Sequence, residues 1–496
     1  MFVLSLDEGT SSARAALYDR QGRNVGMESL PIASEYPHPG WVEQDPAAIW
    51  STQIDTARRL LAKMRVSASE IVAVGITNQR ETTMVWDRVT GEPAAPAIVW
   101  QCRRTADFCA ELARSPNAAL ITGKTGLVID AYFSASKIRW ILDHIPGARE
   151  RARNGDLLFG NVDTWLIWKL TNGAVHATDY SNASRTMLMD LATGEWASDL
   201  LCLFDIPRAM LPRIVPSSGV TGVIAAEHLG AEIPIAGIAG DQQAALAGQA
   251  CFRAGLSKNT YGTGCFTLLH TGAHQPVSKN RLLGTRAASE VAEPRFAIEG
   301  SVFTAGAVIQ WLRDRMGLIR TAAESEEVAL SVPDTGGVYF VPAFVGLGAP
   351  YWDAGARGTL TGVTGSTERA HVVRAALESI AYQTRGLVDA MEADAGEVLR
   401  ELRVDGGAAV NNALMQFQAD ILGRPIVRPA DVETTALGAA YLAGLATGFW
   451  KDLAEVESFW RAERRFDPQM SADRRESLYH GWKAAVVRSR TAPLPV

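Results

Sequence analysis

The sequence has few of the features that mark secreted proteins, membrane proteins or proteins with structural zinc sites. It contains five cysteines among 496 residues and no Cys-x-x-Cys pair, which argues against a disulfide framework and a structural zinc site. It has no run of about 18 or more apolar residues. The first apolar run ends at Leu6, before Asp7, and is too short for a signal peptide. We therefore expect a cytoplasmic protein that does not insert into a membrane.

The chain also lacks a strong excess of positive or negative charge. Charged residues make up 21% of the chain and the formal net charge is -6, with acidic and basic residues interspersed. This balance predicts neither nucleic acid nor an anionic membrane surface as a partner. Hydrophobic residues make up 47%, as in ordinary globular proteins. The chain is longer than one hydrophobic core supports, so we expect at least two domains.

Several familiar phosphate-binding and catalytic motifs are missing. Gly123-Lys124-Thr125 matches the end of a P-loop, but Ala118 stands where that motif requires glycine. No Gly-x-Gly-x-x-Gly opens a helix after a strand, and the eight histidines include no His-Glu-x-x-His. The sequence therefore predicts neither a P-loop nucleotide site nor a metalloprotease, and it offers no Ser-His-Asp arrangement.

Two similar hairpins, one in each half of the chain, are the most informative features present. Residues 2–6 and 13–18 are expected strands, joined by a Gly-Thr-Ser-Ser turn that follows Asp7. Residues 259–269 repeat the design around a Gly-Thr-Gly turn. Backbone N–H groups and hydroxyls in such turns can surround a phosphate, and Asp7 makes sense there if a divalent cation bridges the two. Two ordinary tight turns are the alternative.

Strand and helix patterns alternate along the chain, which is typical of α/β proteins. A helix is expected to begin with Asp45 as N-cap and Pro46 as its first residue. We place the domain boundary near residues 250–256, which gives domains 1–252 and 253–496. Further elements are expected in the second half: helices over 304–316, after Glu368, from about Val410 and in the tail after Asp467, and strands over 338–342 and 402–404.

Polar residues follow two buried strands of the first half. Residues 71–76 end in Asn78-Gln79-Arg80-Glu81, and residues 234–239 end in Gly240-Asp241-Gln242-Gln243. Open α/β sheets bind ligands at the carboxyl ends of such strands. Asp241 is the candidate catalytic residue, because a carboxylate placed there can accept a proton from a substrate hydroxyl. The alternative is that Asp241 caps the following helix, and position alone does not decide between the two roles.

The other candidates are pairs. Arg80 and Glu81 supply donors and acceptors suited to vicinal hydroxyls, or they form a solvated ion pair. Trp100 and Tyr132 can wall a small polar substrate, or they belong to the core. Two further pairs, each with four-residue spacing at the start of a helix, resemble two walls of a purine pocket, although helix-opening glycines are common: Gly407 with Asn411, and Gly306 with Gln310.

Taken together, these residues resemble the FGGY family of carbohydrate kinases. The resemblance runs from Asp7 to the helix after Gly407, and several strings in the same order are far more specific than one motif. The strings are Gly-Ile-Thr-Asn-Gln-Arg-Glu-Thr-Thr (75–83), Trp-Gln-Cys-Arg-Arg-Thr (100–105), Ala-Gly-Asp-Gln-Gln-Ala-Ala-Leu (239–246), Tyr-Gly-Thr-Gly-Cys-Phe (261–266) and Arg-Val-Asp-Gly-Gly-Ala (403–408).

The resemblance implies an actin-like ATPase fold, an α/β protein of two ribonuclease-H-like domains with an interdomain cleft. It implies ATP-dependent, magnesium-assisted phosphorylation of glycerol to sn-glycerol 3-phosphate by a homodimer or homotetramer. The residues implied for the glycerol site are Arg80, Glu81, Trp100, Tyr132, Asp241, Gln242 and Phe266. Those implied for the nucleotide are Thr10, Ser11, Ser12, Arg14, Thr263, Gly306, Gln310, Gly407 and Asn411, with Asp7 and Asp241 serving the metal.

The chain departs from the family pattern at several points. Ala13 and Ala131 replace the more usual Ser and Pro, which we expect to have mild effects. Glu8 stands where the family usually has Gln, which we expect to add negative charge beside the magnesium site. Residues 227–232 lack the Gly-Gly-Arg segment that binds fructose 1,6-bisphosphate in some members, so we expect no strong inhibition by that sugar phosphate.

Three rival functions stay open. One is a kinase for another polyol or ketose, which the Arg80–Glu81 pair with Trp100 and Tyr132 argues against. The others are an actin-like ATPase without a small-molecule acceptor and a non-catalytic regulator with the same fold; the second of these is disfavoured by Asp7 and Asp241.

Overall fold

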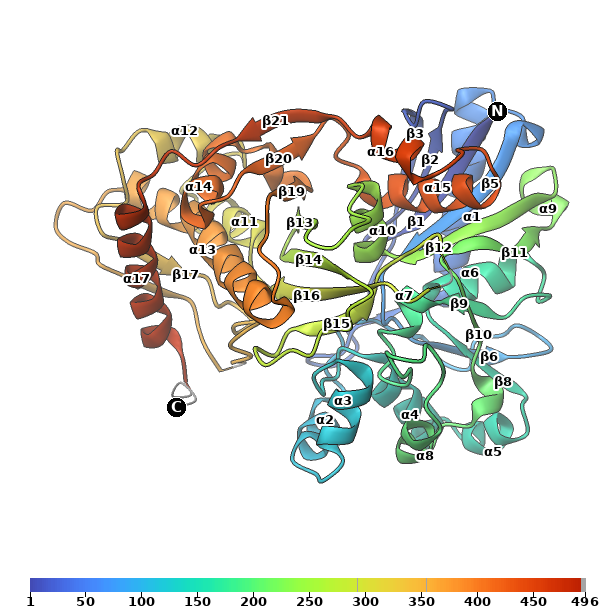
Figure 1. Cartoon of the computed structure of the whole chain (residues 1–496). Coiled ribbons are helices and arrows are strands. Elements are labelled where there is room, and N and C mark those ends of the chain that lie inside the picture. Colours follow the sequence, from blue (N-terminus) through green and yellow to red (C-terminus); the bar gives the residue numbers. More distant parts are fainter. Residues whose placement is uncertain (292, 354, 492–496) are drawn as a thin grey trace.

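The computed structural model describes residues 1–291, 293–353 and 355–491, and Figure 1 shows two α/β units side by side. The first unit holds a six-stranded sheet of order β11-β12-β5-β1-β2-β3. β5 is parallel to β1 and β12, whereas β2 is antiparallel to both β1 and β3. The strands are β1 (Phe2–Glu8), β2 (Ser12–Tyr18), β3 (Asn24–Pro31), β5 (Ile71–Asn78), β11 (Ser218–Ile224) and β12 (Ile233–Gly240).

The second unit repeats this arrangement in a sheet of order β15-β16-β14-β13-β19-β20-β21. β19 is parallel to β13 and β20, and β14 is antiparallel to β13 and β16, as β2 is to its neighbours. The strands are β13 (Ser257–Tyr261), β14 (Cys265–Gly272), β15 (Leu283–Arg286), β16 (Phe296–Val302), β19 (Leu402–Asp405), β20 (Ile426–Pro429) and β21 (Ala462–Phe466). The predicted fold class, two ribonuclease-H-like α/β units, is confirmed.

Both predicted hairpins form, β1–β2 and β13–β14, and their strands run slightly further than expected. Helix α1 (Pro46–Met64) begins as predicted, with Asp45 Oδ1 accepting a hydrogen bond from the N–H of Ala47 at 2.9 Å. Gly123-Lys124-Thr125 lies inside helix α3 (Ala118–Thr125), so it forms no phosphate loop. The expected later elements are α11 (Gly306–Asp314), β17 (Tyr339–Val341), α13 (Arg369–Ala395) and α17 (Ala472–Ser489).

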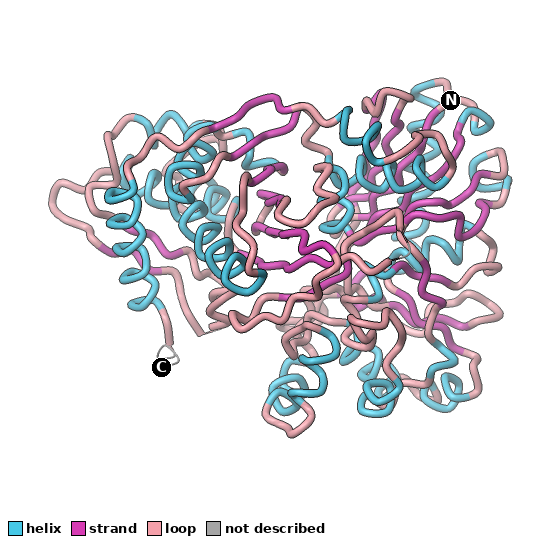
Figure 2. The backbone as a smooth tube through the Cα atoms, in the orientation of Figure 1, coloured by secondary structure: helices cyan, strands magenta, loops and turns pink. Residues whose placement is uncertain are grey.

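Helices surround the strands of both sheets, as the cyan and magenta segments of Figure 2 show. None of the helices within the described ranges has the length and apolar character needed to cross a membrane. Strands β15, β16 and β21 were not predicted. β16 lies beside β14 in the second sheet and carries a residue of the site described below.

Two helices cross where the units meet. α10 (Asp241–Gly248) follows β12 of the first sheet but also packs on β13 and β14, whereas α15 (Thr434–Ala446) follows β20 but packs on β1, β5 and β12. The crossing requires glycine, because a Cβ added to Gly438 would lie 1.8 Å from the carbonyl oxygen of Ala244. The first sheet is built from residues before the predicted boundary at residue 252 and the second sheet from residues after it, whereas α15 from the second half covers the first sheet.

The protein is expected to lose stability below pH 6.5 through His270. This side chain is 3% exposed, and its Nδ1 accepts a hydrogen bond from the N–H of Gly272 at 2.9 Å, which only the neutral ring can do. Burial, assisted by Arg295, lowers its pKa from 6.5 to about 4. The unfolded chain therefore binds a proton between pH 6.5 and 4 that the folded chain does not.

The unfolding free energy should fall with acidity by up to about 1.4 kcal/mol per pH unit in this window from His270 alone. Urea denaturation at several pH values measures the slope. His270→Asn keeps an acceptor near the Nδ1 position but cannot titrate, so its slope should be shallower. Equal slopes in the two proteins would contradict the assignment.

Candidate active site

Arg80 and Glu81 follow β5 and are buried, with 3% and 1% exposure. This burial rules out a solvated surface pair. Glu81 has φ of 61°, a left-handed conformation that is uncommon for non-glycine residues. Its carbonyl oxygen accepts hydrogen bonds from Lys137 Nζ at 3.2 Å and Ser134 Oγ at 3.3 Å. Lys137 Nζ also donates to the carbonyl of Tyr132 at 2.8 Å, so one buried cation holds two backbone segments of the site together.

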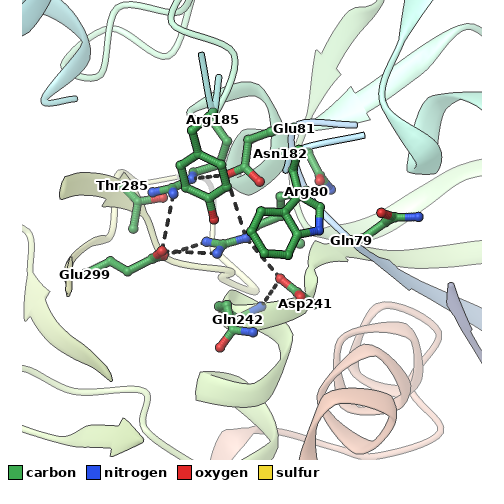
Figure 3. Close-up of polar contacts among 12 residues, drawn as sticks. Gln79, Arg80, Glu81, Asn182, Arg185, Asp241, Gln242, Thr285 and Glu299 are labelled. Atoms are coloured by element: carbon green, nitrogen blue, oxygen red, sulfur yellow. Dashed lines mark hydrogen bonds and ion pairs between the residues drawn. The ribbon is translucent and has the colours of Figure 1, made fainter. Parts of the chain in front are cut away.

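A buried ion cluster surrounds this pair (Figure 3). Arg80 donates from Nη1 and Nη2 to the two carboxylate oxygens of Glu299, at 2.5 and 3.1 Å. Arg185 donates from Nε to Glu81 at 2.6 Å and from Nη2 to Glu299 at 3.2 Å. Glu299 lies on β16 of the second sheet, whereas both arginines come from the first half. The two halves therefore share one cluster.

Asp241 is the accessible acid of this region. Its side chain is 32% exposed, compared with 2% for Arg80 and 0% for Glu299. Its Oδ1 lies 2.9 Å from Nε of Arg80, an ion-pair contact without hydrogen-bond alignment. Gly240, not Asp241, is the N-cap of α10, although Oδ1 of Asp241 accepts from the N–H of Gln242 at 2.7 Å. Asp241 is therefore the first residue of the helix and not its N-cap, so it does not occupy the capping position of the alternative interpretation.

The two aromatic candidates for the substrate wall lie together and also pack against a hydrophobic core cluster. The rings of Trp100 and Tyr132 pack edge to face with centroids 5.6 Å apart. Trp100 Nε1 donates to Thr10 Oγ1 at 2.9 Å, which joins a predicted glycerol residue to the first hairpin. Phe266 lies on β14 opposite Ser301, and therefore on the same sheet face as Glu299. No ring contact joins Phe266 to the other two aromatic residues within the part of the chain described.

Gln242 is held by a lysine from the second half. Lys258 Nζ donates to Gln242 Oε1 and, at 2.9 Å, to Thr260 Oγ1. Lys258 is fully buried, and burial lowers its pKa to about 8 against the opposing effect of Asp405 and Asp241. Lys258 of β13 therefore fixes the side-chain amide of Gln242, which the family resemblance assigns to the glycerol site.

Asp7 and Asp241 are suited to a shared cation. Burial raises the pKa of Asp7 to about 7; Arg14 opposes this, and the charges of Asp241 and Glu433 add to it. Arg14 Nη1 lies 3.8 Å from Asp7 Oδ2 and 3.2 Å from Glu433 Oε2. A cation between Asp7 and Asp241 would relieve their repulsion. Magnesium sites of kinases use one or two carboxylates together with substrate phosphates, which these residues fit. No group of three or more metal-ligating side chains occurs among the described residues.

Glu8 does not add the charge expected beside this position. Side chains alternate along β1, so Glu8 lies on the face of Leu4 and Leu6, opposite Asp7. It is fully buried, and neither carboxyl oxygen has a hydrogen-bond partner among the described residues. Burial, with the charge of Asp7 second, raises its pKa well above 4.5. Burial at this place therefore favours the uncharged form of the Glu8 carboxyl, because an unpaired buried carboxylate is costly.

The first hairpin forms the tight turn predicted for it. The N–H of Gly9 donates to the carbonyl of Ser12 at 3.0 Å, and the carbonyl of Ser11 accepts from Ile32 at 2.9 Å. The second hairpin meets two other predicted nucleotide segments. The N–H of Gly306 donates to the carbonyl of Gly262 at 3.0 Å, and a Cβ at Gly306 would lie 2.6 Å from that oxygen.

Gly406 makes the corresponding approach on the other side of the second hairpin. Its φ is +84°, and an added Cβ would lie 2.6 Å from the carbonyl oxygen of Tyr261. The structure thus brings Thr263, Gly306 and Gly407 to one place. It corrects one local expectation: Gly407 and Asn411 do not share a helix. Gly407 opens a 3-10 turn, and Asn411 is the N-cap of α14 (Asn412–Leu422), where Oδ1 accepts from Leu414 at 2.9 Å. Gly306 and Gln310 do share α11.

The predictions from sequence did not include four charged residues of the candidate site: Glu299, Arg185, Lys137 and Lys258. A signal existed for Glu299, because it is the one charge in the apolar string Phe-Ala-Ile-Glu-Gly-Ser-Val, and a charge within a buried strand needs a partner. Its partners lie over one hundred residues away, so the pattern could not name them.

Comparison with known proteins identifies a family that matches most of the chain. The N-terminal domain model of the FGGY family of carbohydrate kinases matches residues 2–248, and its C-terminal domain model matches residues 257–447. The chain is 58% identical over 488 residues to glycerol kinase 2 of Thermotoga maritima, covering 98% of both chains. It is 58% identical over 490 residues to glycerol kinase of Carboxydothermus hydrogenoformans, covering 99% of this chain and 98% of the relative. It is also similar to the crystal structure of Plasmodium falciparum glycerol kinase with ADP, with a TM-score of 0.93, 38% identity and 99% of each chain covered.

Proposed function

This chain belongs to the FGGY family of carbohydrate kinases, and we propose that it uses Asp241 as the base in phosphorylating glycerol. The activity is ATP-dependent transfer of a phosphoryl group to glycerol, as in its full-length relatives. The observation that carries the base assignment is the contrast in exposure: Asp241 is the accessible carboxylate at the edge of an otherwise buried ion cluster.

The acceptor is held by the buried pair beside that base. Arg80 donates and Glu81 accepts, so together they suit two neighbouring hydroxyls, while Trp100 and Tyr132 cover the carbon face. The third hydroxyl then lies toward Asp241, which receives its proton as the oxygen attacks phosphorus. General-base assistance of this kind contributes about 10²–10⁴ in rate. A buried site that pairs three hydroxyls rejects analogues lacking one by up to about 10⁴.

The nucleotide would be held between the two hairpins. Thr10, Ser11, Ser12 and Arg14 would contact the phosphates from one side and Thr263 from the other. Magnesium bound with ATP supplies neutralising charge for the phosphates, and Asp7 and Asp241 would hold it or its waters. The purine and ribose are assigned to the remaining four residues, Gly306, Gln310, Gly407 and Asn411. Closure of the two units over both substrates would exclude water from the transfer.

An ADP-release assay with magnesium-ATP, with and without glycerol, tests the function. ADP release should depend on glycerol and be much weaker with xylulose or erythritol. Turnover that is the same without any acceptor would indicate an ATPase instead, and a preference for a longer polyol would indicate a sibling kinase. The proposed homodimer or homotetramer and the cytoplasmic location rest on the family alone.

A further inference from the structure

We propose that Glu299, which the second half of the chain supplies, is a positioning residue for the acceptor: it holds Arg80 directly and Glu81 through Arg185. The inference rests on the proposed function of this site. It assigns a role to a residue that touches neither substrate, and it means that the polyol site is not built by the first half alone.

The hydrogen bonds of Arg80 carry the first step. A guanidinium has five N–H groups in a fixed planar fork. Glu299 takes one from each terminal nitrogen, and Gln243 Oε1 lies 3.3 Å from Nη1. With the terminal nitrogens anchored, Nε lies 2.9 Å from Asp241, and one terminal N–H has no partner among the described residues and is open to a substrate hydroxyl. Without Glu299, the carboxylates left beside Arg80 would be Asp241, 2.9 Å from Nε, and Glu81, 4.0 Å from Nε. Closer pairing of Arg80 with Asp241 would occupy oxygens that the proton transfer needs.

The second step runs through Arg185. Glu299 Oε1 accepts from Arg185 Nη2 at 3.2 Å, and Arg185 Nε donates to Glu81 Oε1 at 2.6 Å. The same Oε1 atom of Glu299 also accepts from Arg80 at 3.1 Å. The Glu299 carboxylate thus fixes the positions of Arg80 and Arg185 relative to each other. Because Arg185 holds Glu81, it also fixes the distance between the donor Arg80 and the acceptor Glu81 that would bind the substrate hydroxyls.

Electrostatics favour a charged Glu299 at this place. Burial alone would raise the pKa of Glu299, but Arg185, Arg80 and Lys258 overcome that effect and lower the pKa to about 2. Removing this charge would leave two buried arginines with Glu81 and Asp241 as their remaining carboxylate partners. Those two acids would then be drawn toward the arginines and away from the substrate, because unpaired buried cations are costly.

A purely structural role is the alternative, since Glu299 also joins the two halves. The two roles differ in what they change. A residue that only joins the two halves would affect the stability of the protein and the apparent affinities for glycerol and ATP to a similar extent. A positioning residue changes the apparent affinity for glycerol while leaving that for ATP nearly intact, because the nucleotide segments do not contact Glu299 among the described residues.

The test is steady-state kinetics of the whole protein with Glu299→Gln and Glu299→Asp. The glutamine keeps size but loses charge, and the aspartate keeps charge but withdraws it by one methylene. Glu378→Gln is the matched control, because Glu378 is also buried and pairs with an arginine, Arg374 at 2.8 Å, away from the site.

We expect Glu299→Gln to raise KM for glycerol by about 10- to 100-fold and KM for ATP by less than about 3-fold, with Glu299→Asp intermediate. Glu378→Gln should change neither KM. An unchanged KM for glycerol in folded Glu299→Gln would overturn the proposal; if that variant does not fold, an unchanged KM in Glu299→Asp would do so. Equal rises in both KM values would also overturn it, in favour of the structural role. Failure of wild-type turnover to depend on glycerol would overturn the function itself.

Discussion

Asp241→Asn is expected to reduce glycerol-dependent kcat by about 10²–10⁴ while leaving the protein folded. Asparagine has nearly the same shape but cannot receive the proton of the attacking hydroxyl. The fold should tolerate the change, because the terminal nitrogens of Arg80 stay bonded to Glu299 and the side chain of Asp241 is partly exposed. The loss should therefore lie in catalysis.

Single-turnover measurement of ADP formation at saturating glycerol and ATP separates this loss from slow product release. Thermal unfolding of the variant, with and without glycerol, is the control for folding and binding, because a bound ligand raises the midpoint. If Asp241→Asn kept most of the wild-type single-turnover rate, the base assignment would fail while the glycerol kinase activity stood.

Gly438→Val is expected to lower the unfolding free energy by at least about 3 kcal/mol. Gly438 lies where α15 crosses α10, and even a Cβ there would lie 1.8 Å from the carbonyl oxygen of Ala244 and 2.8 Å from the nitrogen of Gly248. These are backbone atoms of a helix, so they cannot rotate away. The crossing would have to open, which would disturb the contact of α15 with the first sheet.

Gly123→Ala is the control for adding a side chain to a helical glycine that has open space around it. Gly123 also lies within a helix, α3, but a Cβ there meets nothing within 4 Å. Alanine should be neutral or stabilise the protein by up to about 1 kcal/mol through helix propensity. Urea denaturation of both variants measures the difference. A Gly438→Val protein with wild-type stability would show that the two helices can separate at little cost.

Much of the site was predictable because its signals are local. The two hairpins are visible as short apolar strands around glycine and hydroxyl turns, and both formed at the expected places. Asp241 and the Arg80–Glu81 pair follow continuous apolar strands, and a parallel sheet brings such carboxyl ends to one edge. The α1 N-terminus was likewise readable from Asp45 and Pro46. These features depend on residues within a few positions of one another.

Other features were decided by contacts between distant parts of the chain. Glu299 meets Arg80 across 219 residues, and α15 crosses onto a sheet built from the other half. Glu8 shows a different limit: its sequence position suggests a charge beside Asp7, whereas the pleat of β1 turns its side chain into the core, where burial raises the pKa of the carboxyl.

The sequence alone thus determined both hairpins, the α1 N-terminus, the strands that precede Arg80 and Asp241, and the candidate residues beside them, since backbone preference and hydrophobic pattern act over short range. Only the tertiary structure decided how those residues are paired, spaced and charged. Ion pairs between the two halves lower the pKa of Glu299 and orient Arg80, and they arise only when the halves pack together, whereas the burial that raises the pKa of Glu8 arises in the core of the first half.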